Sequence, residues 1–410
     1  MLNRRIALVI GLTVTVALAA LMSGSAIRSA LLSGNARTGG SGASSNANAN
    51  GATGAGTHGA TANTALGATT PGAATSGASP DAALSAAGAQ TTGTGALPFA
   101  FYPAPITAST QVTKFAQQFA ASPAVGISWR FRWADLEPSP GGFDWRPIDN
   151  AMHATQATHK RVILRVIAGL YSPSWVIAKS QRVSVSNLYF PNTTPYANPS
   201  ILPVPWNSTY LADWDTFIRA FGARYDGNGA IYVIELSGGG DIGDMYLPPD
   251  MHAWNLAGYS DARLQGAWQH VISGYAAAFT RTPVDLNITE SLTCSAVSAG
   301  FTNRTCVAGW HSNVLTPLSK WVMSKYPAKV WMQSNGLNPN YAQFPNCPMR
   351  VILRSANAAA YQLNGEMASA TALHQSFTVA RDDHARFVEI YPDNITSAAD
   401  AAAIHYLRYG

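Results

Sequence analysis

The sequence predicts a (β/α)8 barrel, an α/β fold, on three observations. From Leu97 onward, short apolar runs of strand length alternate with longer segments whose apolar residues recur at helical spacing. Eight strand candidates fit between Leu97 and Gly410, a length that suits one such barrel. The first strand candidate is not followed by the G-x-G-x-x-G turn that a dinucleotide-binding open sheet carries.

The strand candidates are runs rich in β-branched and aromatic residues. Parallel strands are buried on both faces and read as nearly continuous apolar runs, as RVILRVIA does at Arg161–Ala168. In chain order, the expected strands are Phe99–Tyr102, Val125–Trp133, Arg161–Ala168, Ile231–Ser237, Val284–Thr289, Lys329–Gln333, Ala358–Leu363 and Arg386–Tyr391.

Amphipathic segments lie between these strands. In Leu211–Tyr225, the residues Trp214, Phe217, Ile218 and Phe221 fall on one helical face, which is typical of a helix packed against a sheet. The other expected helices are Thr110–Ser122, Arg146–His159, Arg263–Thr280, Leu315–Tyr326, Ala370–His384 and Ser397–Tyr409.

Residues 1–28 have the pattern of a secretory signal peptide. Two arginines precede an apolar run from Ile6 to Met22, and small residues follow it. The run also reaches the lower length limit for a membrane span, so an uncleaved membrane anchor is the alternative. Both interpretations take the rest of the chain out of the cytoplasm, to a secreted, periplasmic or cell-surface location.

Residues 29–96 consist almost wholly of Gly, Ala, Ser, Thr and Asn. Such a low-complexity segment buries too little apolar surface to offset its ordering entropy, so we expect a disordered linker. The expected organisation is therefore a leader (1–28), a linker (29–96) and one barrel domain (97–410).

Charge and motifs exclude several classes of partner. The chain has 26 basic and 21 acidic residues, and four of the basic residues precede Leu97, so the barrel is nearly neutral. Without a Lys/Arg cluster, nucleic acid is not expected as a partner. No HExxH, CxxC or GxSxG motif occurs, so we expect neither a metal nor another cofactor. The oligomeric state stays open.

The cysteines are Cys294, Cys306 and Cys347. Cys294 and Cys306 lie 12 positions apart in a loop-like stretch. In an exported protein this favours a disulfide between them, which would leave Cys347 as the odd thiol.

The densest motif is WRFRWADLEPSPGGFDW at Trp129–Trp145. It resembles the W..LEP..G.YDW signature of clan A glycoside hydrolases, nearest to family 42 (β-galactosidase type) and its uncharacterised relatives. The segment that follows, PIDNAMHATQATHKRVILRV, and Pro173-Ser174-Trp175 are similar to further parts of that pattern. The resemblance spans about Leu97 to Gly410. It implies an exported enzyme that cleaves the O-glycosyl bonds of a poly- or oligosaccharide with two carboxyl groups.

Clan A enzymes take their acid/base from the end of strand four and their nucleophile from strand seven. Strand four here runs into ELSGGGDIGDMYLP, which lacks the clan's Asn-Glu pair and offers Glu235 or Asp244 as the acid/base. Glu366, in YQLNGE after strand seven, is the candidate nucleophile or second carboxylate. On strand eight, Glu389 alternates with Val388 and Ile390, which directs it into the barrel.

These carboxylates also have a structural interpretation. Arg130 and Arg165 share inward faces of strands two and three, where they could pair with Glu235 and Glu389 as an ionic network in the core. An inward Arg132 at the mouth suggests instead that the substrate carries uronic acid groups.

Aromatic residues at strand ends and in loops are the second indication of sugar binding, because sugar C–H faces stack on such rings. With polar residues at the mouth, the expected substrate-binding set is Arg132, Trp133, Arg165, Trp175, Trp206, Gln362 and Tyr391. Tyr171, Tyr246 and Trp331 belong to the same class of aromatic residues by their predicted positions.

The scarcity of glutamate and the missing Asn-Glu pair favour an alternative function. The chain would then be a non-catalytic carbohydrate-binding barrel, a degenerate hydrolase displayed on the cell surface. Of the two glutamates not discussed above, Glu137 is expected to brace its loop, and Glu290 is a secondary acid candidate.

Overall fold

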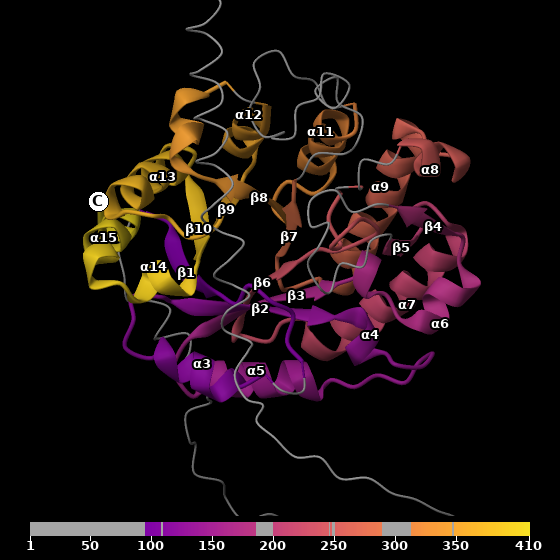
Figure 1. Ribbon diagram of the computed structural model, residues 1–410, viewed down its shortest axis with the longest axis horizontal. Coiled ribbons are helices and arrows are strands. Elements are labelled where there is room, and N and C mark those ends of the chain that lie inside the picture. Colours follow the sequence, from indigo (N-terminus) through magenta and orange to yellow (C-terminus); the bar gives the residue numbers. More distant parts are fainter. Residues whose placement is uncertain are drawn as a thin grey trace, which may run out of the picture. The chain divides into compact units, whose positions relative to one another are not determined.

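The computed structural model describes residues 95–107, 110–185, 200–245, 247, 251–288, 313–346 and 348–410 (Figure 1). The leader, most of the linker, Tyr246, Glu290 and the cysteines Cys294, Cys306 and Cys347 lie outside these ranges, so the interpretations of them stay predictions. Within these ranges no helix combines the length and the apolar character needed to span a bilayer.

Eight parallel strands close into a barrel, which confirms the predicted fold class. Each strand pairs with its chain neighbours, and β10 pairs with β1 to close the ring. In chain order the barrel strands are β1 (Leu97–Phe101), β2 (Gly126–Arg132), β3 (Arg161–Ile167), β6 (Ile231–Glu235), β7 (Val284–Asn287), β8 (Val330–Leu337), β9 (Ala359–Leu363) and β10 (Ala385–Ile390).

Helices cover the outside of the barrel (Figure 1). The apolar face of α7 is buried as its sequence pattern predicts, with Trp214, Phe217 and Phe221 fully enclosed. The helices are α3 (Val112–Gln118), α4 (Trp133–Leu136), α5 (Arg146–Gln156), α6 (Ser174–Lys179), α7 (Ser208–Tyr225), α8 (Met251–Leu256), α9 (Asp261–Ala278), α11 (Leu315–Lys325), α12 (Pro348–Ser355), α13 (Ala370–Asp382), α14 (Pro392–Thr396) and α15 (Ala401–Tyr409).

Several elements were not expected from the sequence, among them the short helices α4, α6, α8 and α14. An antiparallel pair, β4 (Arg182–Val185) and β5 (Ser200–Pro203), stands outside the barrel as a separate two-stranded sheet. Helix α12 follows β8 and buries Met349, Ile352 and Leu353. Its single apolar face is only two turns long and begins at Pro348, which reads as a loop in the sequence.

The interior of the barrel is apolar near the amino ends of the strands. Phe99, Ile163, Val233 and Phe387 pack there as a cluster separate from the core between sheet and helices. A Cβ at Gly126 would lie 2.2 Å from the Phe99 ring, so this strand position has room for no side chain. This cluster, the apolar floor, is the base on which the polar residues of the interior rest.

Candidate active site

Four polar residues from alternate strands converge inside the barrel above the apolar floor. Ser128 of β2, Glu235 of β6, Gln333 of β8 and Glu389 of β10 are each at most 1% exposed. Inward side chains from alternate strands form such layers in (β/α)8 barrels, usually from aliphatic residues. A polar layer at this depth is an exception, and buried polar groups require partners.

The two glutamates of this polar layer face each other. β6 and β10 stand on opposite sides of the ring, so their inward side chains meet at the axis. Gln333 Nε2 donates to Glu389 Oε2 at 2.9 Å. Burial, together with the charge of Glu235 within hydrogen-bonding reach, raises the pKa of Glu389 to about 8. Near pH 7 Glu389 therefore keeps its proton.

Two arginines adjoin the polar layer. Arg165 is fully buried, and its Nη1 lies 3.8 Å from Glu235 Oε2. Its Nη2 donates to the Ile242 carbonyl oxygen at 3.1 Å. Arg130 Nη2 donates to Gln362 Oε1 at 2.5 Å. One nitrogen of each guanidinium thus has a protein acceptor, while Arg130 Nε and Arg165 Nε and Nη1 have no hydrogen-bond partner among the described residues. Arg165 and Gln362, where the sequence suggested substrate binding, therefore make contacts within the protein.

A third carboxyl group near the polar layer was missed by the sequence interpretation. Asp285 of β7 is fully buried, and burial followed by the charges of Glu235 and Glu389 raises its pKa well above the usual range. The available signal was its place within the strand VDLN, where it shares a face with Asn287.

The loop after β6 is held tightly against the barrel mouth. Leu170 N donates to the Asp241 carbonyl at 3.0 Å, and Gly238 N donates to the Gly243 carbonyl at 2.9 Å. Gly243 has φ +78°, and a Cβ there would lie 2.0 Å from Ser237 Oγ, so the turn requires glycine. With the bond from Arg165 to Ile242, these contacts fix the loop after strand four that carries Asp244, whose surface is 6% exposed.

Glu366 lies beyond the carboxyl end of β9 and is exposed. It contributes, with Glu389, to raising the pKa of Tyr391, although burial is the larger cause and Arg130 opposes it. Tyr391 packs edge-on against Phe101 with ring centres 5.1 Å apart. Glu366, Tyr391 and Arg130 thus belong to one side of the mouth.

The structure corrects the expected role of Trp133. The residue begins α4 and is fully buried against Trp214, with ring centres 4.6 Å apart. Its Nε1 donates to Glu137 Oε2 at 2.8 Å, and Glu137 Oε1 accepts from Gly141 N at 2.9 Å. Trp133 therefore packs the core, and Glu137 braces its loop as predicted.

Trp175 and Trp206 are half-buried, and both indole N–H groups are engaged by backbone oxygens. Trp175 Nε1 donates to the Glu137 carbonyl at 3.0 Å, and Trp206 Nε1 donates to the Ala257 carbonyl at 3.1 Å. Lys179 Nζ lies over the Trp175 ring, 4.8 Å from its centre, and the Trp206 ring packs against Trp254 and Tyr259. Arg132, one third exposed, forms a two-pronged ion pair with Asp135 at 2.6 and 3.0 Å.

Trp331 lies far from the position that the sequence suggested. It is the second residue of β8 and packs against the apolar floor at the amino ends of the strands, whereas the expected strand placed it near the mouth. Tyr171, which follows β3, is 8% exposed and belongs to the buried core.

Among the residues that the structure describes, no group of three or more His, Cys, Asp or Glu side chains is arranged to hold a metal ion. The titratable groups gathered inside the barrel are carboxyls and guanidiniums, whose chemistry is proton transfer and charge stabilisation.

No family model matches the chain, and no curated protein matches it. Among solved structures, the catalytic domain of β-amylase from Paenibacillus polymyxa has a TM-score of 0.53 and 12% identity, covering 76% of this chain and 95% of that chain. An iminocyclitol complex of endo-glycoceramidase II from Rhodococcus sp. has a TM-score of 0.48 and 12% identity, covering 76% and 78%. An exo-β-1,4-mannosidase from Opitutaceae bacterium strain TAV5 has a TM-score of 0.42 and 11% identity, covering 76% and 59%.

At these identities the likeness is one of fold. Family 42 receives no specific support from it. The chain shares its eight-stranded parallel barrel with the catalytic domain of that β-amylase, which confirms the predicted fold class.

Proposed function

We propose that this chain is an exported glycoside hydrolase that acts on a poly- or oligosaccharide. The observation that carries the proposal is the position of Asp244 and Glu366, which follow strands four and seven at the carboxyl ends. In (β/α)8 enzymes the loops at these ends build the active site. In this assignment Asp244 is the acid/base, and Glu366 is the nucleophile or second carboxylate.

Burial favours Asp244 over Glu235 for contact with substrate. Glu235 points into the polar layer toward Glu389 and Arg165, beneath the loop that carries Asp244. Glu235 and Glu389 then act on the mouth through Arg130: burial and Arg165 lower the pKa of Arg130, and the charges of the two glutamates oppose that lowering.

For the sugar itself, the half-buried rings of Trp175, Trp206 and Tyr391 offer apolar faces beside polar groups. Arg132 can reach a substrate only in competition with Asp135.

The test is hydrolysis of a panel of aryl glycosides and oligosaccharides by the full chain. We expect Asp244→Asn and Glu366→Gln each to lower kcat/KM by about 10²–10⁴-fold, the usual range for an acid/base group. Asp382→Asn, an exposed carboxylate on the outer helix α13, is the matched control and should leave the rate unchanged.

Sugar binding by the wild-type chain without turnover over long incubation would overturn this proposal. That result would support the non-catalytic carbohydrate-binding barrel instead. Activity that survives both substitutions would reject the two assigned carboxylates.

A further inference from the structure

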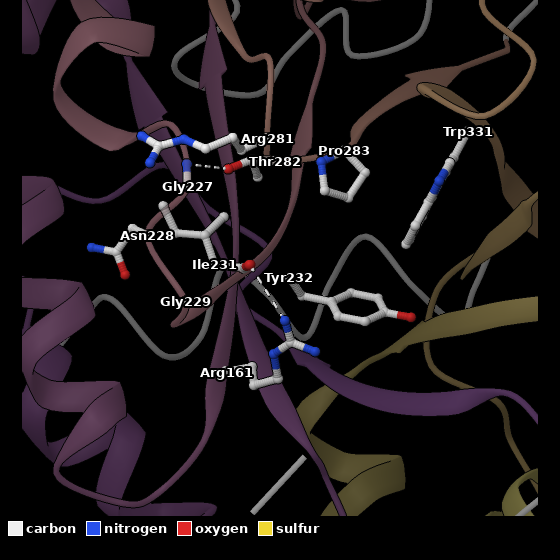
Figure 2. Close-up of a pocket in the computed structure, with 10 residues that line it drawn as sticks. All are labelled: Arg161, Gly227, Asn228, Gly229, Ile231, Tyr232, Arg281, Thr282, Pro283 and Trp331. Carbon is white, nitrogen blue, oxygen red and sulfur yellow. Dashed lines mark hydrogen bonds between the residues drawn. The ribbon is translucent and has the colours of Figure 1, made fainter. Parts of the chain in front are cut away.

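A second hollow lies at the opposite end of the barrel from the mouth. It has a volume of about 430 Å³ and opens at the amino ends of β3, β6, β7 and β8. Side chains from several strands and loops line it, chiefly Arg161, Tyr232, Arg281, Pro283 and Trp331 (Figure 2). The backbone of residues 227–229 completes the wall. This volume falls within the range of small-molecule sites in proteins.

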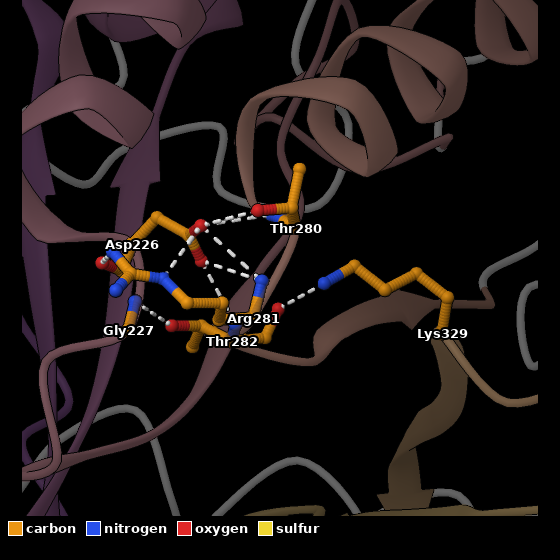
Figure 3. A network of polar contacts seen from close by, with 6 residues as sticks. All are labelled: Asp226, Gly227, Thr280, Arg281, Thr282 and Lys329. Atoms are coloured by element: carbon orange, nitrogen blue, oxygen red, sulfur yellow. Dashed lines mark hydrogen bonds and ion pairs between the residues drawn. The ribbon is translucent and has the colours of Figure 1, made fainter.

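The rim of the hollow is held in place before any ligand arrives (Figure 3). Asp226 accepts hydrogen bonds from the backbone N–H groups of Thr280, Arg281 and Thr282, at 2.8–3.2 Å. Burial would raise the pKa of Asp226, but these bonds outweigh it and lower the pKa well below the usual range. Gly227 N donates to Thr282 Oγ1 at 2.8 Å. The turn after α7 is therefore fixed to the turn before β7.

Arg281 is not the cation that a ligand would find. Its Nη2 and backbone N–H both bind Asp226, and its Nε lies 3.5 Å from Asp226 Oδ2. Arg281 thus belongs to the rim.

Two other arginines lie at the hollow, and neither is paired with a carboxylate: Arg161 lines it, and Arg386 lies beside it, next to the lining residue Trp331. The Arg161 guanidinium lies 4.7 Å from the Tyr232 ring centre, and the Arg386 guanidinium lies 5.2 Å from the Trp331 ring centre. The charges of both act on Tyr232, which places them around one aromatic pair. Within the described part of the chain neither forms an ion pair, and Arg161 makes one long hydrogen bond, 3.5 Å to the Ile231 carbonyl.

Stacking on a ring fixes a guanidinium and leaves its N–H edge available. Such an edge suits the two oxygens of a carboxylate or phosphate, in bidentate geometry. Tyr232 and Trp331 contact each other edge-on at 5.5 Å and supply an apolar surface, while Asn228 and its neighbouring peptide groups supply donors and acceptors. The combination is one anion-binding fork, one apolar surface and several polar groups.

We propose that this hollow binds a small hydroxylated anion, whose carboxylate or phosphate group is held by Arg161, with Arg386 beside the hollow adding to the positive charge. The site is separate from the mouth, and the proposal does not depend on hydrolysis there. A uronic acid and a sugar phosphate both have this chemistry, and the experiment distinguishes them.

The experiment is calorimetric titration of the full chain with glucuronate, a galacturonate oligosaccharide, glucose 6-phosphate, inorganic phosphate and glucose. We expect one anion class to bind with a stoichiometry near one, glucose not to bind, and the affinity to fall with added salt. Arg161→Gln should weaken binding by about tenfold or more, and Arg386→Gln by several-fold, as expected for charge-assisted hydrogen bonds.

Arg219→Gln is the matched control, because it removes an exposed arginine of α7 whose partner is Thr216. It should leave binding unchanged, as should Asp244→Asn at the mouth. Arg386 is exposed, so its variant should fold even if Arg161→Gln does not.

Tighter binding of the two uronates identifies a carboxylate ligand, and tighter binding of phosphate or glucose 6-phosphate identifies a phosphate ligand. The proposal is overturned if none of the anions binds with a dissociation constant below about 10 mM, since weaker binding than this is not specific recognition. It is equally overturned if binding persists undiminished in folded Arg161→Gln or Arg386→Gln. Loss of hydrolysis in Asp244→Asn with intact anion binding would support the proposal that the hollow is a site separate from the mouth.

Discussion

The two ends of the barrel use arginine in different ways. Toward the mouth, Arg130 and Arg165 are buried, and they bind Gln362, Glu235 and the Ile242 carbonyl. At the amino ends of the strands, Arg161 and Arg386 stack on aromatic rings and, among the described residues, form no ion pair. Arg130 also stacks on a ring, that of Phe101 at 4.2 Å, so the two ends differ in the side-chain acceptors that bind the arginines and not in the stacking.

The largest expected difference between the two ends is in stability. Arg165→Met leaves Glu235 buried without its cation, and removing one partner of a buried pair costs about 3–5 kcal/mol. Arg161→Met should cost about 1 kcal/mol or less, because no buried charge loses its partner. Urea unfolding of both variants measures the loss in the free energy of unfolding. Similar losses in the two variants would mean that the arginines at the two ends do not differ in their contribution to stability.

The next effect is a dependence on pH. The pKa of Glu389 is about 8 in the folded chain, above its unfolded value, so the folded state holds this proton more tightly. Its contribution is fully present below the unfolded pKa and is lost as the pH rises to about 8. At about 1.4 kcal/mol per pKa unit, the total loss is on the order of 5 kcal/mol. Glu389→Gln, which cannot ionise, should flatten this slope between pH 5 and pH 8.

Urea midpoints of wild type and Glu389→Gln at those two pH values provide the measurement. A parallel fall in both proteins would assign the slope to another group, with Asp285, whose pKa is also raised by burial, as the next to test.

Gly126→Ala tests the apolar floor that separates the two ends. The added Cβ would lie 2.2 Å from the Phe99 ring and 2.5 Å from the Arg161 carbonyl oxygen. Overpacking of this kind costs about 1–3 kcal/mol. The thermal midpoint should fall, and an unchanged midpoint would mean that the floor adapts readily.

The smallest effect is expected at Arg132. Its pair with Asp135 is one third exposed, and such surface pairs contribute about 0–1 kcal/mol. Arg132→Gln should therefore leave the unfolding midpoint nearly unchanged. If the substrate is acidic, the same variant should reduce kcat/KM for acidic oligosaccharides more than for neutral ones. Equal reductions would mean that Arg132 does not recognise acidic groups, and only the hollow at the amino ends of the strands would remain as a site for them.

The sequence carried enough information for the barrel. The parallel strands are buried on both faces, so each appears as an apolar run, and the observed bounds differ from the predicted ones by few residues except in β8, which extends to Leu337. The sequence did not predict helix α12 or the β4–β5 pair, because both are short. The apolar pattern of α12 covers about two helical turns, and that of the β4–β5 pair covers only a few residue pairs.

The candidate site was less predictable than the fold. The alternation of residues along a strand shows whether a side chain points into the barrel, but not how far along the barrel axis it lies. This alternation correctly directed Glu389 and Arg130 inward. It could not show that Trp133 turns into α4 and the core, since this depends on where β2 ends. It also could not assign Trp331 to the floor, because the predicted strand was several residues too short at its carboxyl end.

The contacts that fix the Asp244 loop have a kinetic consequence. Arg165 binds Ile242 across 77 residues of sequence, and Ala168 N binds Ser237 Oγ across 69. Forming such contacts closes a long loop, which costs entropy, and the pairing of β3 with β6 is what offsets this cost. The mouth should therefore be among the last parts of the barrel to assemble, and the candidate site should form only when the core is complete.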